Sequence, residues 1–210
     1  MEKVSKTLRA HYENRFRNHG ATSEGADWGC DEKRVFLRYE KMLSVLSEKE
    51  CGVPSILDVG CGYGGLLNYA TIKGIALNYT GVDVAENMVQ YAKITFPGAK
   101  FLAGDVLDID FGQLFDYVVC NGILTQKLDV PALVMDDFAG RLIRRMFTLC
   151  KKGVAFNIMT TKVNFYSNNL YYRNPSEMLA WVITEITPYV RLDHSYPLFE
   201  YTMYLLREPL

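Results

Sequence analysis

The distribution of apolar and polar positions changes character along the chain. After Pro54, short apolar runs typical of buried strands alternate with longer stretches in which apolar residues recur at helical spacing. The predicted strands are residues 55–59, 79–82, 100–103, 115–120 and 154–159, and the predicted helices between them are 65–75, 85–96 and 131–151. This alternation favours a doubly wound α/β fold with a mostly parallel sheet, because parallel strands need crossover connections.

The two ends of the chain depart from this alternation. Residues 189–194 and 199–207 are strand-like runs joined by a short link, which predicts a terminal hairpin that adds an antiparallel strand and completes a seven-stranded sheet. Residues 4–17 and 31–49 have helical spacing, and the segment 18–30 between them is predicted to be a loop. We therefore expect residues 1–30 to form an N-terminal helical appendage with a lid-like loop, and residues 31–210 to form the α/β domain.

Composition and charge exclude several classes of protein. The chain has 210 residues, of which 49% are hydrophobic, and a formal net charge of -1. It can bury a sizeable core, it has no basic excess typical of nucleic-acid binders, and no apolar run approaches the roughly 20 residues of a membrane span. The N-terminus alternates charged and polar positions, unlike a secretory signal. We expect a cytoplasmic protein with no nucleic-acid or membrane partner.

Cysteine and histidine spacing argues against a metal site. The five cysteines include no C-x-x-C pair. The three histidines have neither i, i+4 pairing nor nearby cysteine partners. We therefore expect no metal and reduced cysteines.

The densest chemical signal follows the first predicted strand. Gly60, Gly62, Gly64 and Gly65 lie within six residues, at the junction with a helical stretch. Glycines permit positive φ and let a ligand approach the backbone N–H groups at a helix N-terminus. The spacing also fits the dinucleotide fingerprint, and Asp83 after the next strand is placed to accept hydrogen bonds from a ribose. An NAD-dependent oxidoreductase is therefore one interpretation of these residues.

Four segments in order carry a more specific signal. Residues 57–64 contain the glycine turn with an acid two places before its first glycine, and residues 81–88 contain the acid at the end of the next strand. Residues 104–106 follow the third strand, and residues 115–122 form the fourth. Together they resemble the class I, Rossmann-like S-adenosylmethionine (SAM)-dependent methyltransferases of small molecules. The resemblance implies SAM as cofactor, S-adenosylhomocysteine (SAH) as product, and a reversed seventh strand.

The resemblance also implies a set of cofactor-binding residues: Asp58, Gly60, Cys61, Gly62, Gly64, Asp83, Val84, Met88, Gly104, Asp105, Val106 and Asn121. SAM carries an ammonium and a carboxylate but no phosphate. Asp58 beside the glycine turn can therefore balance the ammonium, whereas it would repel a pyrophosphate. This charge argument favours SAM over a nicotinamide cofactor. A SAM-binding regulatory or partner protein without turnover is the other alternative.

The expected acceptor is a small polar metabolite or a sugar-like molecule. Residues 121–124 lack the Pro-Pro-aromatic motif of adenine-targeting methyltransferases, and the near-neutral charge also disfavours nucleic acid. His11 and Tyr12 are the predicted catalytic residues, because a histidine titrates in the range that suits a general base. The predicted acceptor-binding residues come from the loop 18–30 and the polar, aromatic segment 161–174: Trp28, Tyr166, Asn169 and Tyr172.

Overall fold

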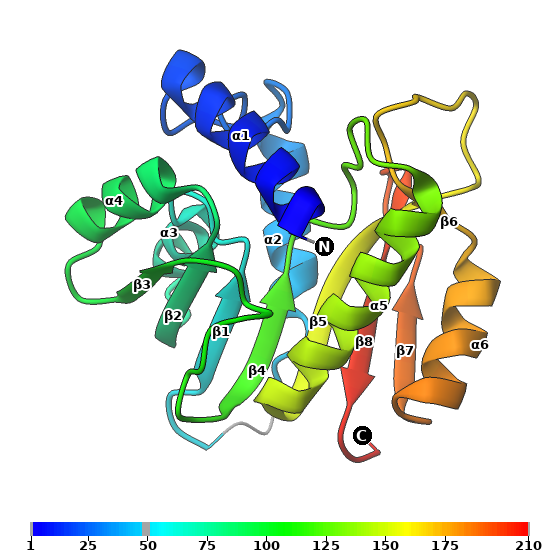
Figure 1. Cartoon of the computed structure of the whole chain (residues 1–210). Helices are drawn as coiled ribbons and strands as arrows, with labels where there is room; N and C mark the ends of the chain where they lie inside the picture. The colour runs from blue at the N-terminus through cyan, green and yellow to red at the C-terminus, as the bar shows by residue number, and fades with distance from the viewer. Residues whose placement is uncertain (1, 48–50, 210) are drawn as a thin grey trace.

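One twisted sheet forms the centre of the computed structural model, which describes residues 2–47 and 51–209 (Figure 1). Seven strands follow the order β3-β2-β1-β4-β5-β8-β7, and β6 pairs with β5 outside this path. The strands are β1 (Ser55–Val59), β2 (Asn78–Asp83), β3 (Lys100–Ala103), β4 (Phe115–Cys120), β5 (Cys150–Thr160), β6 (Tyr172–Arg173), β7 (Val190–Asp193) and β8 (Glu200–Leu206).

Strand directions confirm the predicted sheet. Strands β3, β2, β1, β4 and β5 run parallel to one another, and β8 is antiparallel to both β5 and β7. The fold is therefore the mostly parallel α/β sheet with a reversed strand that the sequence predicts, extended by the two-residue strand β6. The carboxyl ends of the parallel strands meet along one edge, where open α/β sheets bind ligands.

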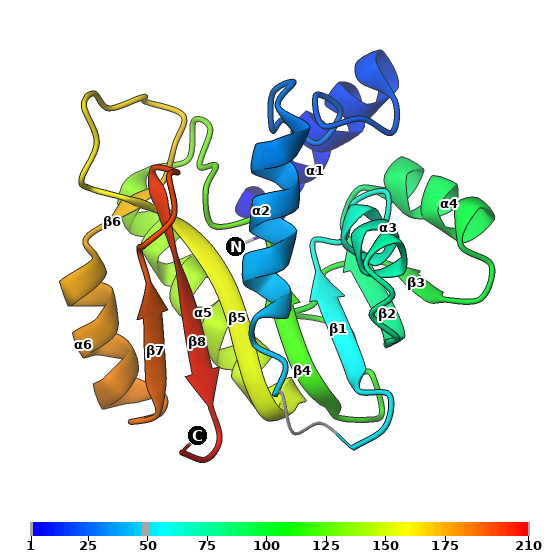
Figure 2. The same cartoon turned by 180° about the vertical axis from the view of Figure 1, so that it is seen from behind.

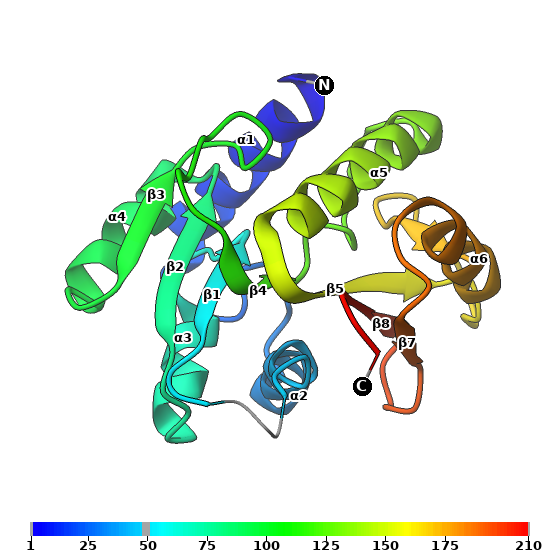
Figure 3. The same ribbon diagram turned by 90° about the horizontal axis from the view of Figure 1, so that it is seen from below.

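Helices cover both faces of the sheet (Figures 2 and 3). Helices α2 (Glu32–Leu43), α3 (Gly65–Ile72) and α4 (Glu86–Thr95) contribute to one buried apolar cluster. Helices α1 (Glu2–His19), α5 (Ala132–Leu149) and α6 (Pro175–Glu185) contribute to the other. Successive strand residues point to opposite faces, so β4 gives Val118 and Cys120 to the α5 side and Tyr117 and Val119 to the α2 side.

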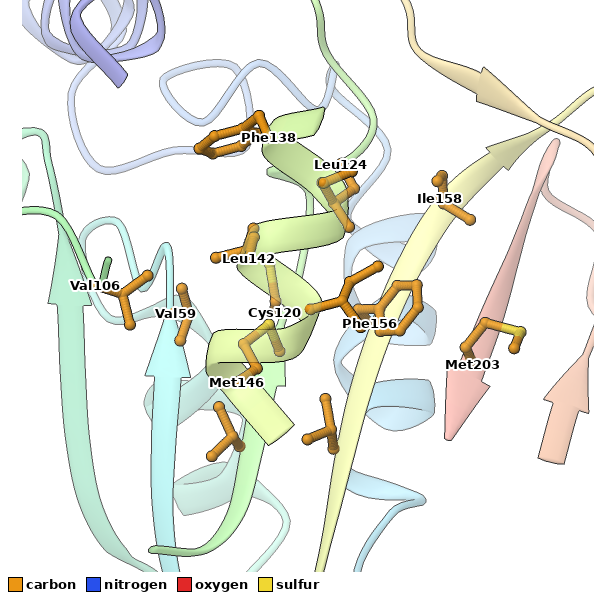
Figure 4. Close-up of a cluster of buried hydrophobic side chains, with 14 of the residues drawn as sticks. Val59, Val106, Cys120, Leu124, Phe138, Leu142, Met146, Phe156, Ile158 and Met203 are labelled. Carbon is orange, nitrogen blue, oxygen red and sulfur yellow. The ribbon is translucent and has the colours of Figure 1, made fainter. Parts of the chain in front are cut away.

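Helix α5 supplies the centre of the larger cluster (Figure 4). Its Leu142 and Met146 pack over the sheet among Val59, Cys120 and Phe156, all of which are at most 2% exposed. Burying a side chain of this size stabilises the fold by about 1.5–3 kcal/mol. The layer of α5 on the sheet thus fixes the ends of β1 and β4, which carry the candidate site.

Three elements differ from the sequence prediction. Helix α2 ends at Leu43 rather than at residue 49, because Ser44 caps it, and residues 48–50 lie outside the described part of the chain. Helix α6 and strand β6 were not predicted. Helix α6 begins where the Asn174 side chain accepts a hydrogen bond from the Ser176 N–H and Pro175 occupies the first turn, which is a recognisable start signal.

Helix α1 lies over the carboxyl edge of the sheet and contacts α4 and α5 (Figure 1). Val4 is fully buried and Leu8 is 4% exposed, and both join the α5 cluster. The segment therefore adds no strand to the sheet but covers its ligand-binding edge. No helix within residues 2–47 and 51–209 is long and apolar enough to cross a membrane.

Candidate active site

Glycine keeps the turn between β1 and α3 open at two positions. Gly60 has φ +77°, and a Cβ at this position would lie 2.7 Å from the Ile123 side chain. Gly62 has φ +53°, and its N–H donates a 2.8 Å hydrogen bond to Oδ2 of Asp83. L side chains are strained at such φ values, so glycine is required for this path of the backbone. The turn brings the ends of β1 and β2 together.

A cavity opens at this edge, beneath α1. Most of the predicted cofactor-binding residues line it: Gly60, Gly62, Asp83, Val84, Met88, Gly104, Asp105, Val106 and Asn121. Asp58 and Cys61 line an adjoining pocket that shares Gly60, Gly62 and Asn121 with the first. Gly64 faces away from both, toward the Phe96 ring.

Asp83 joins the glycine turn to the start of α4. Its Oδ2 accepts from the Gly62 N–H and its Oδ1 accepts from the Ala85 N–H, both at 2.8 Å. Burial raises the pKa of this carboxyl, and the backbone donors partly offset that rise. Each carboxylate oxygen has a second lone pair. Asp83 therefore holds the turn in place and still has acceptor capacity for a ligand hydroxyl in the cavity.

Asp58 lies at the other end of the joined pockets. It is 2% exposed, and its Oδ2 accepts a 2.6 Å hydrogen bond from the Tyr79 hydroxyl. Burial raises the pKa of the Asp58 carboxyl to about 7. Within the described residues it has no cationic partner. A buried carboxyl of this kind is suited to a cationic ligand group that restores its charge.

Asn121 stands between these two acids, at the end of β4. It is 8% exposed, it lines both pockets, and neither atom of its side-chain amide has a hydrogen-bond partner. The neighbouring Gly122 N–H donates to Oδ1 of Asn157 at 2.8 Å, which fixes the backbone here. Buried polar atoms without partners are rare. The amide of Asn121 is thus available to a ligand.

Trp28 closes the same region from the loop between α1 and α2. It lines both pockets, and its indole packs so closely on Gly122 that a Cβ there would lie 2.7 Å from Cζ2. The Arg38 guanidinium covers the indole at 4.6 Å, and its Nε donates to the buried Glu200 carboxylate at 2.8 Å. The indole is therefore held from both sides.

Comparison with known proteins agrees with this geometry. A methyltransferase-domain family model matches residues 56–153. Over 154 residues the sequence is 30% identical to Rv1506c, a Mycobacterium tuberculosis protein assigned as a methyltransferase, covering 71% of this chain and 90% of that protein. The chain belongs to the class I SAM-dependent methyltransferases. Its cofactor is therefore SAM rather than a nicotinamide.

Solved structures of this family share the fold. Magnesium protoporphyrin IX methyltransferase from Synechocystis PCC 6803, with bound SAM, has a TM-score of 0.66 and 14% identity, covering 98% of this chain and 97% of that chain. DhpI in a complex with SAM and HEP has a TM-score of 0.66 and 15% identity, covering 97% of this chain and 98% of that chain. The likeness extends over α1 and the terminal hairpin as well as the central sheet.

The residues of both pockets fit SAM as a class I methyltransferase would hold it. In that arrangement Asp105 and Val106 would face the adenine, Asp83 has acceptor capacity for ribose hydroxyls, and Asp58 would face the ammonium. Asn121 lines both pockets. When bound, SAM supplies an electrophilic methyl group on a sulfonium. The protein supplies orientation and exclusion of water around that methyl.

Replacement of Asp83 by Ala is expected to weaken SAH binding about 10- to 150-fold, because hydrogen bonds to a charged group contribute roughly 1.5–3 kcal/mol. Isothermal titration calorimetry measures the change. Asp110→Ala is the matched control, because Asp110 is exposed and accepts only from the nearby Gly112 N–H. Equal SAH affinity in folded Asp83→Ala and the parent protein would limit this acid to a structural role.

SAH affinity is expected to fall as the pH drops below about 7. In the free protein the Asp58 carboxyl, whose pKa burial raises to about 7, is protonated under these conditions, and the ligand ammonium must displace that proton. The loss approaches about tenfold per pH unit and disappears in Asp58→Asn. Calorimetry in buffers of different ionisation enthalpy reports the released proton directly, and a flat profile in the parent protein would contradict the assignment.

Thermal unfolding gives an independent measure of Asp58. Its pKa is higher in the folded than in the unfolded protein, so its favourable contribution is complete near pH 4 and is lost as the pH rises through 7. Asp58→Asn is therefore expected to raise the melting temperature at pH 8 and to leave it nearly unchanged near pH 4. The same variant binds SAH more weakly at pH 8, which separates stability from function.

The two predicted catalytic residues take different positions. Tyr12 lines the cavity, whereas His11 stands beside it on α1, with its ring 5.1 Å from that of Tyr12. Nε2 of His11 lies 2.8 Å from Oδ2 of Asp27, which also accepts from Nε2 of Gln126 at 3.0 Å. His11 thus joins α1 to the loop between α1 and α2, and Asp27 of that loop joins it to Gln126 after β4. A base role for His11 stays a prediction.

The predicted acceptor-binding residues are also divided. Trp28 lines the cavity, but Tyr166, Asn169 and Tyr172 do not line either pocket. Nδ2 of Asn169 donates to Oε1 of Gln126 at 3.0 Å, and the rings of Tyr166 and Tyr172 make an edge contact at 4.8 Å. Gln126 in turn donates to Asp27 and also lines neither pocket, so the segment 161–171 lies outside the two pockets.

Sequence reasoning missed several lining residues. Phe138 and Leu142 of α5, Ser5 and Leu8 of α1, Tyr39 of α2 and Tyr63 of the turn all line the two pockets. Ser5 also donates a hydrogen bond to Asp105. The apolar members look like ordinary core positions in the sequence. A serine or tyrosine on an amphipathic helix gives no sign of the element it faces.

Proposed function

We propose that the protein transfers the methyl group of SAM to a small polar metabolite or a sugar-like acceptor without a negative charge. The acceptor would bind beside Tyr12, Trp28 and Asn121. The observation that carries this proposal is the charge of the lining. None of the described residues that line the two pockets is Lys, Arg or His, whereas three of them are the acids Asp58, Asp83 and Asp105. An anionic acceptor would find no cationic side chain in this lining.

The chemistry of methyl transfer suits this lining. As the new bond forms, positive charge moves from the sulfonium toward the acceptor, and an in-line geometry at about 3–3.5 Å supplies most of the acceleration. Burial and the nearby acids Asp27 and Asp83 raise the pKa of Tyr12, so its phenol stays protonated. Tyr12 therefore orients the acceptor through a hydrogen bond. Trp28 provides an apolar wall that excludes water.

Isotope transfer tests the proposal. The protein is incubated with a cell extract and SAM carrying a ¹³C-labelled methyl, and mass spectrometry identifies molecules that gain it. The extract is first separated into anionic and non-anionic small-molecule fractions. We expect label in the non-anionic fraction and none with Gly62→Val as the inactive control. Label confined to anionic molecules would contradict the proposed acceptor class, and SAH binding without any labelled product would favour the non-catalytic alternative.

A further inference from the structure

The hydroxyl of Tyr39 reaches from α2 to the first residue of α3. We propose that this hydroxyl binds the carboxylate of the methionine part of SAM, and that Tyr39 is thus a cofactor-specificity residue. The inference rests on the proposed function only in that the same two pockets hold SAM.

The contact between Tyr39 and Gly65 places this hydroxyl. A Cβ on Gly65 would lie 2.1 Å from the Tyr39 oxygen, so the phenol occupies the volume that any other residue would fill. Gly65 is the first residue of α3, where backbone N–H groups lack partners within the helix. Tyr39 and Gly65 both line the smaller pocket. The phenol therefore adds a side-chain donor to the anion-attracting end of α3.

A second tyrosine lies beside Tyr39. Tyr63 lines the same pocket, and its phenol interacts with that of Tyr39. Burial raises the pKa of both phenols, so both keep their protons. Each phenol has a single O–H donor, so a contact between the two hydroxyls uses one of the two donors and leaves the other for a carboxylate. The two tyrosines together can therefore donate one hydrogen bond to an anionic group.

The acid that suits the ammonium of SAM lies next to these phenols. Asp58 lines this pocket too, and its charge acts on the Tyr39 phenol. The ammonium and carboxylate of an amino acid share one carbon, so their binding groups must lie side by side. The unpartnered, 8% exposed amide of Asn121 borders the same pocket and independently indicates a polar ligand there.

Only neutral hydrogen-bond donors among the described residues of the smaller pocket are available to the SAM carboxylate. Among the described residues of this pocket there is no Lys, Arg or His. A carboxylate buried without hydrogen bonds is strongly disfavoured. The Tyr39 hydroxyl and the first N–H groups of α3 are therefore its counterparts. This also explains the glycine at position 65, which a tight turn alone does not require.

Calorimetry with two ligands tests the inference. SAH carries the carboxylate, and its decarboxylated analogue retains the adenosine, the sulfur and the amine. We expect Tyr39→Phe to weaken SAH at least about tenfold, the effect of a lost hydrogen bond to a charged group, and to change the affinity for the analogue less than about twofold. Tyr69→Phe is the control, because Tyr69 contacts the Tyr39 ring at 5.9 Å without lining the pocket.

Gly65→Ala provides a second route to the same loss. Its new methyl would displace the Tyr39 hydroxyl, so it should also weaken SAH selectively, and the double variant should lose little more than either single one. Equal losses for both ligands, or an unchanged SAH affinity in Tyr39→Phe, would overturn the inference. A parent protein that binds SAH with this selectivity but labels no acceptor would instead contradict the proposed function.

Discussion

Deletion of residues 1–30 is expected to abolish methyl transfer, with at least about a 10²-fold loss of turnover, which is the scale on which misplaced reacting groups lose rate. Helix α1 and the loop after it supply Ser5, Leu8, Tyr12 and Trp28 to the cavity. On this prediction they form the wall that separates the transferred methyl from solvent. Without them the acceptor would meet the sulfonium in water, where its orientation is lost.

The deletion should also lower stability. Val4 and Leu8 are buried in the α5 cluster, and each such side chain contributes about 1.5–3 kcal/mol. Exposed polar contacts of α1, such as the pair of Arg9 and Glu86, contribute little. We therefore expect α1 to be held on the α/β domain mainly by the apolar side chains of its first two turns. Scanning calorimetry should show that the truncated protein still unfolds in a cooperative transition, at a lower melting temperature than the parent protein.

Two point variants distinguish a base role of His11 from a role in holding α1 over the cavity. If His11 is the base for an alcohol acceptor, His11→Ala lowers the rate about 10²- to 10⁴-fold, whereas Asp27→Asn, which keeps the imidazole, lowers it much less. If His11 only fastens α1 through Asp27, the two variants produce similar and smaller losses. Full turnover by the deleted protein would contradict the lid altogether.

Gly62→Val is expected to remove detectable SAH binding, a loss of at least about 10²-fold. The side chain would point into the space that the cofactor needs, since the Met88 sulfur at 3.6 Å is its only neighbour within 4 Å among the described residues. It would also strain the turn, because Gly62 has φ +53° and an L residue costs about 1–2 kcal/mol there. The hydrogen bond from Gly62 to Asp83 would then weaken as well.

Gly112→Val is the control for backbone strain alone. Gly112 has φ +63°, is exposed, and would place a Cβ in open space away from the cavity. Both variants should lose similar stability in thermal unfolding, whereas only Gly62→Val should lose SAH binding in calorimetry. If the two variants bind SAH equally well, the glycine turn is not the cofactor site.

The fold was largely predictable because its signals are local. Each buried strand gives an apolar run, the glycine turn follows β1 directly, and Asp83 is the last residue of β2. The acids of the site could therefore be named before their contacts were known. Helix α6 was missed although Asn174 and Pro175 mark its start, because the polar run before it favoured a continuous loop.

Contacts across the fold could not be predicted in this way. Tyr39 meets Gly65 only because α2 packs beside α3, and His11 meets Asp27 because the loop returns along α1. Asn169 similarly meets Gln126 outside the two pockets, because the segment after β5 folds back over the loop after β4. Such pairings depend on how elements pack, and a single sequence records no sign of them. They are also where the catalytic and acceptor residues differ most from expectation.

Titration calorimetry with SAH tests the central claim most directly, because the account stands on a SAM site built from the glycine turn, Asp83 and Asp58. The parent protein should bind SAH, should be stabilised by about 2.7 kcal/mol when SAH exceeds its dissociation constant 100-fold, and should give no heat with NADH. Binding of NADH without binding of SAH would contradict the account.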